Sequence, residues 1–454
     1  MTKEKTAAIV LAAGLGTRME SRLPKVLHRL AGRPMIGHLM ETLAGMEFER
    51  IVVVVGDDME AVVDAVAPHR TVVQKDRLGT GHAVRTACEA VDGFDGTVLV
   101  LYADAPLISR ETLTRALAAR RAAPGPAVVV LGFRPSDPGP YGRLIVDADG
   151  TLEAIVEAGD ATPEQGAIDL CNAGVMAIDS GPLPGLLKRV GRDNAKGEYY
   201  LTDIVAMARG DGLTCAVVEG DEAELIGVNS RADLARAEAV VQERLRAAAM
   251  AGGASLADPE TVYFSHDTRL GRDVTVGPHV VFGPGVAVGD GVEILAFCHI
   301  EGARIAAGAR IGPFARLRPG ADIAAQAHIG NFVEIKNAQV ETGAKINHLA
   351  YVGDSRVGAK ANVGAGTITC NYDGFAKHHT DIGAGAFIGS NTALVAPVTV
   401  GDGAIVGAGS VITGDVAADA LALTRPDQEE LKGWAKRFRG RQSGRKAARP
   451  KGGG

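Results

Sequence analysis

Aromatic residues are scarce in this chain: they make up 4% of its 454 residues, and Trp434 is the single tryptophan. Cysteine is scarce as well, since the five cysteines are scattered and none stands in a Cys-x-x-Cys pair. This spacing argues against a zinc site and against a disulfide framework. We therefore expect reduced thiols and a cytoplasmic location.

A strong net charge and long apolar runs are also lacking. The formal net charge of −6 gives no case for a nucleic-acid partner. No signal peptide or membrane-spanning run is visible, so we expect no stable membrane insertion. Residues 432–454 are the exception, with nine Lys or Arg and no acidic residue. We expect their Gly/Ala/Pro-rich end to be a solvated disordered tail, and the alternative is a basic contact to a membrane or a nucleic acid.

Glycine, by contrast, is abundant, with 59 residues, and it accompanies a six-residue repeat. An apolar residue returns at every sixth position across 276–412, apart from three shorter steps and a polar stretch at 369–381. This period fits neither an α-helix nor a long strand, but it fits short strands joined by tight turns and wound into a parallel coil. The inward positions are Val276, Phe282, Val288, Ile294, Ile300, Ile305, Ile311, Leu317, Ile323, Ile329, Ile335, Val340, Ile346, Val352, Val357, Val363, Ile382, Ile388, Leu394, Val400, Val406 and Ile412.

The repeat resembles the hexapeptide-repeat, left-handed parallel β-helix of acyltransferases. The left hand is implied by that resemblance alone, because parallel crossovers are otherwise right-handed. The alternative is a coil that serves only as a scaffold for assembly. The polar stretch at 369–381 argues against this alternative, since a purely structural coil has no need of an interruption.

The N-terminal half begins with an apolar run at 7–11 that leads into a glycine-rich loop at 12–19. A strand followed by such a loop is a setting for holding phosphates. The loop lacks the Gly-Lys-Ser/Thr ending of a P-loop, and Met19 stands where a dinucleotide fingerprint has its third glycine. Pro24-Lys25 places a second cation close to Arg18 and the loop.

Helical and strand patterns alternate after this loop, which predicts a mostly parallel sheet with helices on both faces. Ligands of such sheets lie beyond the carboxyl ends of the strands. Residues 14–18, 74–82 and Asp104 follow strands and are therefore expected to converge on one crevice. The expected helices lie at 34–46, 59–66, 82–91, 231–251 and 427–439, and the expected strands at 50–55, 71–74 and 97–102. We expect Trp434 to pack on the coil.

Several motifs together resemble one enzyme family. The stretch 11–19 with Pro24-Lys25 resembles the signature of sugar-nucleotide pyrophosphorylases, and segments at 78–82, 141–143, 194–203 and 227–229 narrow the match. With the coil segment 366–374, the chain up to Arg425 resembles the bifunctional N-acetylglucosamine-1-phosphate uridylyltransferase / glucosamine-1-phosphate acetyltransferase family. The resemblance implies an α/β Rossmann-like nucleotidyltransferase domain at 1–229, a linker helix at 230–253, a left-handed β-helix acetyltransferase domain at 254–425, and a C-terminal helix with a basic disordered tail at 426–454.

The first expected site joins UTP to a sugar phosphate. Charge builds up during attack on the α-phosphorus, so the site needs cations, backbone N–H groups and a divalent metal more than a base. Arg18 and Lys25 supply the cations, and Asp104 is an oxygen ligand of the kind Mg²⁺ prefers, although it is equally suited to capping a helix. The resemblance makes Asn229 the second metal ligand. It also implies that UTP and UDP-N-acetylglucosamine bind at Leu11, Ala12, Ala13, Gly14, Gln74, Gly79, Thr80, Gly81, Gly142, Glu157, Asn172 and Asn229, with 199–202 nearby.

Two qualifications apply to this site. Glu157 and Asn172 have an alternative role as caps of turns. In addition, Ala103, Gly159 and Ser230 depart from the family's usual residues, which affects the expected sugar preference more than the phosphate chemistry.

The second expected site transfers an acetyl group from a thioester to a sugar amine, which requires a group that accepts the amine proton. His348 is suited to this role near neutral pH and matches the family's catalytic position. Its alternatives are a buried histidine bonded to the backbone and a metal site with His299 and His328. The resemblance implies sugar-phosphate binding at Arg318, Lys336, Tyr351, Asn362 and Lys377, and acetyl-CoA binding at Asn371, Tyr372, Ser390, Ala408 and Arg425. Glu334 is expected either to orient a neighbour or to be a solvated carboxylate.

The resemblance implies successive steps on one chain. Acetyl-CoA acetylates glucosamine 1-phosphate, and UTP with Mg²⁺ then converts N-acetylglucosamine 1-phosphate into UDP-N-acetylglucosamine for cell-wall and lipopolysaccharide precursors. The family's interrupting loop, which carries Lys377, reaches a neighbouring subunit and implies a homotrimer. The alternatives are a monofunctional pyrophosphorylase with a regulatory coil and a non-catalytic assembly module.

Overall fold

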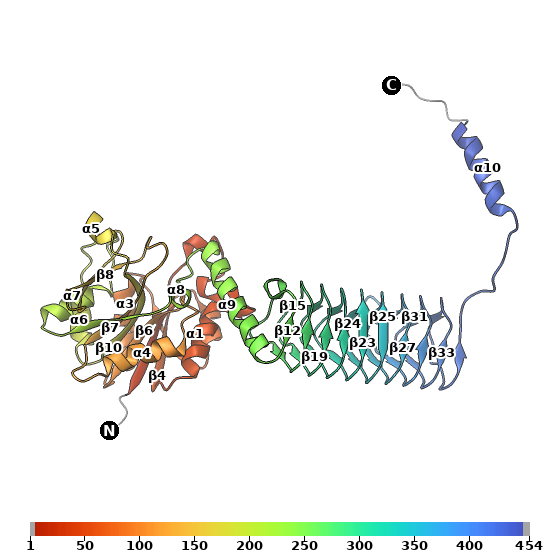
Figure 1. The fold of residues 1–454 in the computed structure, drawn as a ribbon, viewed down its shortest axis with the longest axis horizontal. Helices are drawn as coiled ribbons and strands as arrows, with labels where there is room; N and C mark the ends of the chain where they lie inside the picture. The colour runs from red at the N-terminus through yellow and green to blue at the C-terminus, as the bar shows by residue number, and fades with distance from the viewer. Residues whose placement is uncertain (1–4, 448–454) are drawn as a thin grey trace. The chain divides into compact units, whose positions relative to one another are not determined.

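A computed structural model describes residues 5–447, with side chains described for residues 5–444. The chain forms two compact units (Figure 1). The first contains the described residues up to Thr268 together with Val281–Gly285, and the second contains Arg269–Val280 and the described residues from Val286 onward. No helix among the described residues is both long and apolar enough to span a membrane.

The first unit is built on a mixed, mainly parallel sheet. Its main path runs in the order β11-β7-β10-β6-β1-β4-β5, in which β10 pairs antiparallel with β6 and β7 and the other neighbouring pairs are parallel. Strands β8 and β9 form a hairpin beside this path, in which β8 pairs with β10. The strands are β1 (Thr6–Leu11), β4 (Arg50–Gly56), β5 (Arg70–Gln74), β6 (Thr97–Tyr102), β7 (Val128–Phe133), β8 (Arg143–Val146), β9 (Leu152–Val156), β10 (Cys171–Asp179) and β11 (Cys215–Glu219).

Alternate residues of the central strands enter two different cores. Ala7 and Ile9 of β1 pack with helices α3, α6 and α7, whereas Ala8 and Val10 pack with α1, α2 and α4. Successive side chains of a strand point to opposite faces, so a sheet covered on both faces needs apolar residues at every position. The helices are α1 (Met35–Ala44), α2 (Glu60–Val66), α3 (Thr80–Cys88), α4 (Arg110–Arg120), α6 (Leu183–Arg189) and α7 (Asp203–Gly210). The expected alternation of strands and helices is confirmed.

Helix α9 (Arg231–Ala251) has the bounds expected for the long helix and belongs to the first unit. Its first turn is held by a capping box, in which Ser230 Oγ accepts from the Asp233 N–H and the Asp233 carboxylate accepts from the Ser230 N–H. Glu238 accepts a hydrogen bond of 2.8 Å from the Ala31 N–H, and Gln242 exchanges two with the Phe264 backbone. The helix is therefore anchored along its length.

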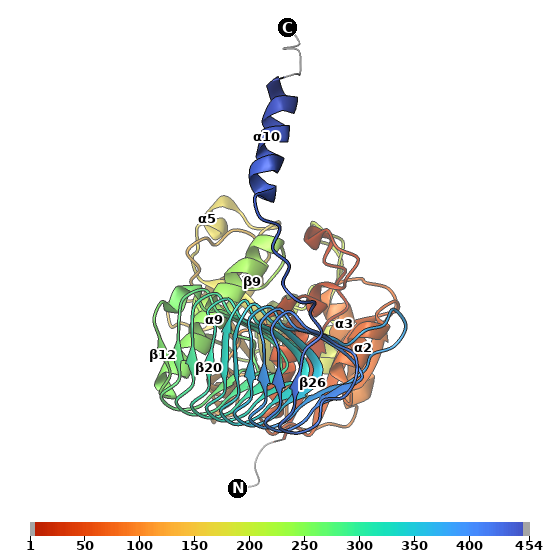
Figure 2. The ribbon, with the colours of Figure 1, turned by 90° about the vertical axis from the view of Figure 1, so that its right-hand side faces the viewer.

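The second unit is a parallel β-helix. Equivalent residues of successive turns are neighbours, as in the column Ile294, Ile311, Ile329, Ile346, Val363, Ile388 and Val406. These side chains are at most 3% exposed, so the six-residue repeat marks the interior as expected. Figure 2 shows the turns stacked one behind another. The column's strands are β17 (Glu293–Ile294), β20 (Arg310–Ile311), β23 (His328–Asn331), β25 (Lys345–His348), β27 (Asn362–Val363), β30 (Phe387–Ile388) and β33 (Ile405–Val406).

One corner of the coil carries a ladder of stacked rings. His279, Phe297, Phe314 and Phe332 stack in sequence with ring centroids 4.8 to 5.0 Å apart. Each has a positive φ between 55° and 62°, which is uncommon for residues other than glycine. Stacking of aromatic rings at this spacing offsets part of the backbone strain.

The C-terminal helix α10 (Trp434–Ala447) begins and ends later than the expected 427–439. Trp434 stacks on Phe438 of the same helix at 5.0 Å and is half exposed. Its packing on the coil stays a prediction. The remainder of the expected disordered tail lies outside the described residues.

Removal of an inward side chain should destabilise the coil more than removal of an outward one. Ile388 is fully buried, whereas Ile405 in the adjacent strand is 49% exposed. We expect Ile388→Ala to lower the free energy of unfolding by about 2–5 kcal/mol and Ile405→Ala to lower it by less than about 1 kcal/mol. Urea denaturation at one fixed protein concentration checks this, and equal losses would contradict one-sided packing.

Candidate functional sites

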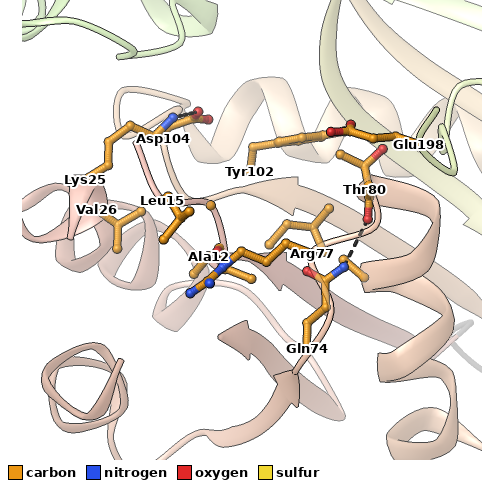
Figure 3. A pocket seen from close by; sticks show the side chains of 15 residues that line it. Ala12, Leu15, Lys25, Val26, Gln74, Arg77, Thr80, Tyr102, Asp104 and Glu198 are labelled. Atoms are coloured by element: carbon orange, nitrogen blue, oxygen red, sulfur yellow. Dashed lines mark hydrogen bonds and ion pairs between the residues drawn. The ribbon is translucent and has the colours of Figure 1, made fainter. Parts of the chain in front are cut away.

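A cavity of about 390 Å³ lies in the first unit, beyond the carboxyl ends of β1, β5 and β6 (Figure 3). This is the crevice at which the sequence places the glycine-rich loop, the 74–82 segment and Asp104. The expected residues that line it are Leu11, Ala12, Ala13, Gly14, Lys25, Gln74, Gly79, Thr80 and Asp104. Arg18 does not line it: its side chain is exposed in the short 3₁₀ helix η1 (Thr17–Met19).

Gly16 holds the loop against Lys25. Its φ of +65° is in the left-handed region, and a Cβ at this position would lie 2.5 Å from Lys25 Cβ. Lys25 itself starts the 3₁₀ helix η2 (Lys25–Leu27), directly after Pro24. The close approach of the two segments directs the lysine side chain into the cavity.

The Lys25 ammonium lies between the two expected metal ligands. Lys25 Nζ is 3.0 Å from Asn229 Oδ1 and also forms an ion pair with Asp104. Figure 3 shows Lys25 pointing toward Asp104. The two oxygens therefore converge on one cation position, which fits the donor set of a hard divalent ion. The alternative in which Asp104 caps a helix is wrong, because Ser109 caps α4.

The protein supplies few metal ligands at this position. Among the described residues, no group of three or more His, Cys, Asp or Glu side chains is placed to hold a metal. Two protein oxygens are the pattern expected for Mg²⁺, which takes its other ligands from phosphates and water.

Gln74 is oriented by two hydrogen bonds at the opposite side of the cavity. Its Nε2 donates to the Gly79 carbonyl at 3.1 Å and to His82 Nδ1 at 3.0 Å. Burial lowers the pKa of His82, so the neutral ring accepts. Both amide protons of Gln74 are thus used, and Oε1 is left as an acceptor. Gly81 binds the Tyr199 carbonyl through its N–H at 2.8 Å, and a Cβ on Gly79 would clash with that carbonyl.

Gly142, Glu157 and Asn172 come together from three strands or their ends. The Asn172 N–H donates to the Gly142 carbonyl at 2.8 Å, and Glu157 accepts from Thr202 at 3.1 Å. The alternative role as a turn cap holds for Asn172, because its Oδ1 accepts from the Gly174 N–H at 2.8 Å.

Tyr102 and Arg77 also line the cavity, although neither was among the expected ligand-binding residues. Tyr102 ends β6, and burial raises the pKa of its hydroxyl far above the usual range. Arg77 donates to the Ala13 carbonyl at 2.8 Å and pairs with Asp58 at 2.5 Å. The end of a strand was a usable signal for Tyr102. Arg77 lies in the 74–82 segment that was expected at this crevice, but no pattern in the sequence indicates its hydrogen bond to Ala13.

In the second unit, His348 has a side-chain partner. Its Nδ1 lies 2.6 Å from Asn331 Oδ1, and the two residues are neighbours on adjacent strands of the coil. The histidine is exposed, so the alternative of a buried ring bonded to the backbone is wrong. The metal alternative with His299 and His328 also fails, since the described residues contain no such cluster.

A group of cations lies on an adjacent face of the coil. Lys336 and Lys377 are neighbours, and the direct contact with Lys336, together with the repulsion of its charge, lowers the pKa of Lys377. Arg318 forms an ion pair of 2.8 Å with Glu334, which is therefore not a purely solvated carboxylate. Tyr351 is the strand neighbour of Glu334.

The expected acetyl-CoA residues fall into two groups. Asn371 binds Asp354 and lies 3.5 Å from the Tyr351 hydroxyl, which places it beside the cations. Arg425 donates to the Ala408 carbonyl at 2.6 Å, and the Gly409 N–H donates to the Ser390 carbonyl. Tyr372, also expected at acetyl-CoA, is 61% exposed and donates to the Gly374 carbonyl. Asn362, expected at the sugar phosphate, lies in β27.

Comparison with known proteins assigns both units. A family profile described as a MobA-like NTP transferase domain matches residues 8–161, and one described as bacterial transferase hexapeptide (six repeats) matches residues 267–302 and 379–414. The chain is thus a nucleotidyltransferase joined to a hexapeptide-repeat transferase, and its coil is of the left-handed class.

Full-length relatives define the family. Proteins named "Bifunctional protein GlmU" from Paramagnetospirillum magneticum, Rhodospirillum rubrum and Azorhizobium caulinodans are 67%, 69% and 56% identical to this chain. The matches cover 98%, 96% and 97% of this chain and 99%, 97% and 98% of the relatives. The chain belongs to the bifunctional GlmU family, with an acetyltransferase and a uridylyltransferase activity. The monofunctional and the non-catalytic alternatives are therefore wrong.

A side chain at position 16 should disturb the uridylyltransferase site alone. Gly16→Ala forces Lys25 aside and strains the loop, and a displacement of about 1 Å can cost roughly 100-fold in rate. We expect the uridylyltransferase kcat/KM to fall about tenfold or more and the acetyl-transfer rate to stay constant. Gly185→Ala in α6 is the control, because an added Cβ there meets nothing within 4 Å. Full uridylyltransferase activity in Gly16→Ala would contradict the role of this contact.

Proposed function

We propose that the chain first acetylates glucosamine 1-phosphate in the coil and then transfers UMP from UTP to the product in the crevice of the first unit. The observation that carries this proposal is the chemistry of the two sites. In the first unit, the Lys25 ammonium lies between two oxygen ligands beside a glycine-rich loop. In the coil, one ring nitrogen of His348 is hydrogen-bonded to Asn331. We assign the domains to 1–229, 230–253, 254–425 and 426–454. The product is UDP-N-acetylglucosamine for cell-wall and lipopolysaccharide precursors, made in the cytoplasm.

In the first site, a phosphate oxygen of N-acetylglucosamine 1-phosphate attacks the α-phosphorus of UTP as the bond to pyrophosphate breaks. The backbone N–H groups of the glycine-rich loop and the Lys25 ammonium stabilise the charge that builds on the phosphate oxygens. Arg18, exposed on the same loop, meets the leaving pyrophosphate. Asp104 and Asn229 hold Mg²⁺, which supplies further neutralisation of the triphosphate when bound.

The remaining residues of the first site select the ligands. Oε1 of Gln74, left free by its two donated hydrogen bonds, accepts from a uracil N–H. Gly142, Glu157 and Asn172 bind the sugar, and the contact of Thr202 with Glu157 orients that carboxylate.

In the second site, His348 accepts the proton of the sugar amine as the amine nitrogen attacks the thioester carbonyl. The C–N bond forms, the C–S bond breaks, and coenzyme A leaves as the thiolate. Asn331 Oδ1 accepts from His348 Nδ1–H, which leaves the lone pair on Nε2 for the incoming proton. Asn331 is thus a positioning residue.

The cations beside this histidine bind the sugar phosphate. Lys336 and Lys377 repel each other, and a phosphate between them removes that repulsion. Arg318, Tyr351 and Asn362 complete the sugar site. Acetyl-CoA lies against Asn371, Tyr372, Ser390, Ala408 and Arg425, with the arginine toward its phosphates. We infer that the coil assembles as a homotrimer, since hexapeptide-repeat transferases are suited to oligomerisation.

Single substitutions should separate the two activities. We expect His348→Ala to lower acetyl transfer by about 10²–10⁴-fold and to spare uridylyl transfer. Asp104→Ala should raise the activation free energy of uridylyl transfer by several kcal/mol, which lowers its rate about 100-fold or more. Acetyl transfer should be spared. Product analysis with glucosamine 1-phosphate, acetyl-CoA, UTP and Mg²⁺, each omitted in turn, measures both steps. Loss of both activities in either variant, or acetyl transfer intact in His348→Ala, would contradict the assignment.

A carboxylate at position 331 should change the pH dependence of acetyl transfer. In Asn331→Asp the new negative charge favours the protonated His348 ring over the neutral one. The histidine is then neutral only at higher pH, so the acidic limb of the acetyl-transfer pH–rate profile should move upward. Gln326→Glu, which adds the same charge on an exposed side chain of the coil, is the control. An unmoved profile in Asn331→Asp would contradict a direct effect of position 331 on the base.

A further inference from the structure

We propose that Lys25 acts as an internal competitor for the divalent ion: its ammonium holds the oxygens of Asp104 and Asn229, and the ion binds tightly only when nucleotide phosphates draw the ammonium away. This inference rests on the metal site proposed above. It adds to that site a coupling between the nucleotide and the metal, with Lys25 as the residue that carries the coupling.

The backbone at both ligands is held in place without Lys25. The Val228 N–H donates to the Asp104 carbonyl at 2.8 Å, which ties the end of β6 to the segment before α9. The Asn229 N–H donates to Asp233 at 3.1 Å, in the first turn of that helix. Backbone contacts therefore fix the chain at both ligands, whereas the Lys25 ammonium reaches their side-chain oxygens through a flexible four-carbon chain.

One cation position cannot hold two cations. Lys25 Nζ is within hydrogen-bonding distance of both oxygens, so a divalent ion bound to the same atoms must displace it. The side chains of Lys25 and Asp104 are only 11% and 20% exposed, and charges at such a site interact more strongly than in water. The ion pair thus lowers the affinity of the nucleotide-free protein for a divalent ion.

Nucleotide phosphates offer the ammonium another partner. The glycine-rich loop that is proposed to hold them contacts the Lys25 stem at Gly16. A phosphate that takes the ammonium frees Asp104 and Asn229, and by linkage a metal bound at these oxygens strengthens phosphate binding by the same factor. The coupling delays metal binding until the substrate that needs it is present.

Mn²⁺ binding to the nucleotide-free, full-length protein tests this inference, with free Mn²⁺ measured by electron paramagnetic resonance. We expect Lys25→Met to bind Mn²⁺ at least about tenfold more tightly than the wild type. Lys75→Met, which removes an exposed lysine next to Gln74, is the control and should change the affinity by less than about twofold. Lys25→Gln serves as a second variant if Lys25→Met fails to fold. Unchanged or weaker Mn²⁺ binding in the folded Lys25 variant would overturn the inference.

A second measurement separates this inference from the proposed metal site. In the protein saturated with UDP-N-acetylglucosamine, Asp104→Asn should abolish the tight Mn²⁺ binding of the wild type. If that binding does not depend on Asp104, the proposed metal site is wrong and the inference is overturned with it. If Asp104→Asn abolishes binding but the Lys25 variants bind Mn²⁺ like the wild type, the metal site stands and the competition by Lys25 is wrong.

Discussion

Parallel strand pairing is the constraint on which both units depend. Parallel strands cannot be joined by a tight hairpin, so each needs a connection that returns the chain to the same edge. In the first unit helices make this return, and the loops after β1, β5 and β6 therefore meet at one cavity. In the coil the return takes two further short strands, so residues of successive turns lie side by side, as Asn331 and His348 do. The chemistry of each unit follows from which residues this geometry brings together.

Positive charge is arranged differently in the two sites. In the first, the Lys25 ammonium is neutralised by Asp104 and bound by Asn229. In the second, Lys336 and Lys377 lie next to each other, and their contact lowers the pKa of Lys377. A lysine that is paired with a carboxylate has to leave this partner before it can bind a phosphate. Two lysines that repel each other are instead stabilised directly when a phosphate binds between them. The first arrangement favours coupling between ligands, and the second favours simple capture of an anion.

Much of the fold could be predicted because its patterns are local. The six-residue period identified the buried positions of the coil, and the alternation of strands and helices placed Asp104 and Gln74 at one sheet edge. The left-handed backbone at Phe297 could not be predicted, because the corner that it occupies forms only when successive turns of the coil stack; Leu349, which has no ring, has a positive φ as well. The role of Asn331 was missed for the same reason: its distance from His348 is set by the register of two strands.

The helix α9 does more than connect two parts of the chain. The Asp233 carboxylate accepts from the backbone of both Asn229 and Ser230, so the capping of this helix also positions a proposed metal ligand. Ser230 departs from the residue that the family often has, yet it keeps the capping box complete. The departure is therefore compatible with the metal site, because the site depends on the start of the helix and serine is among the residues that start helices best. The stability of α9 and the geometry of the uridylyltransferase site are thus parts of one arrangement.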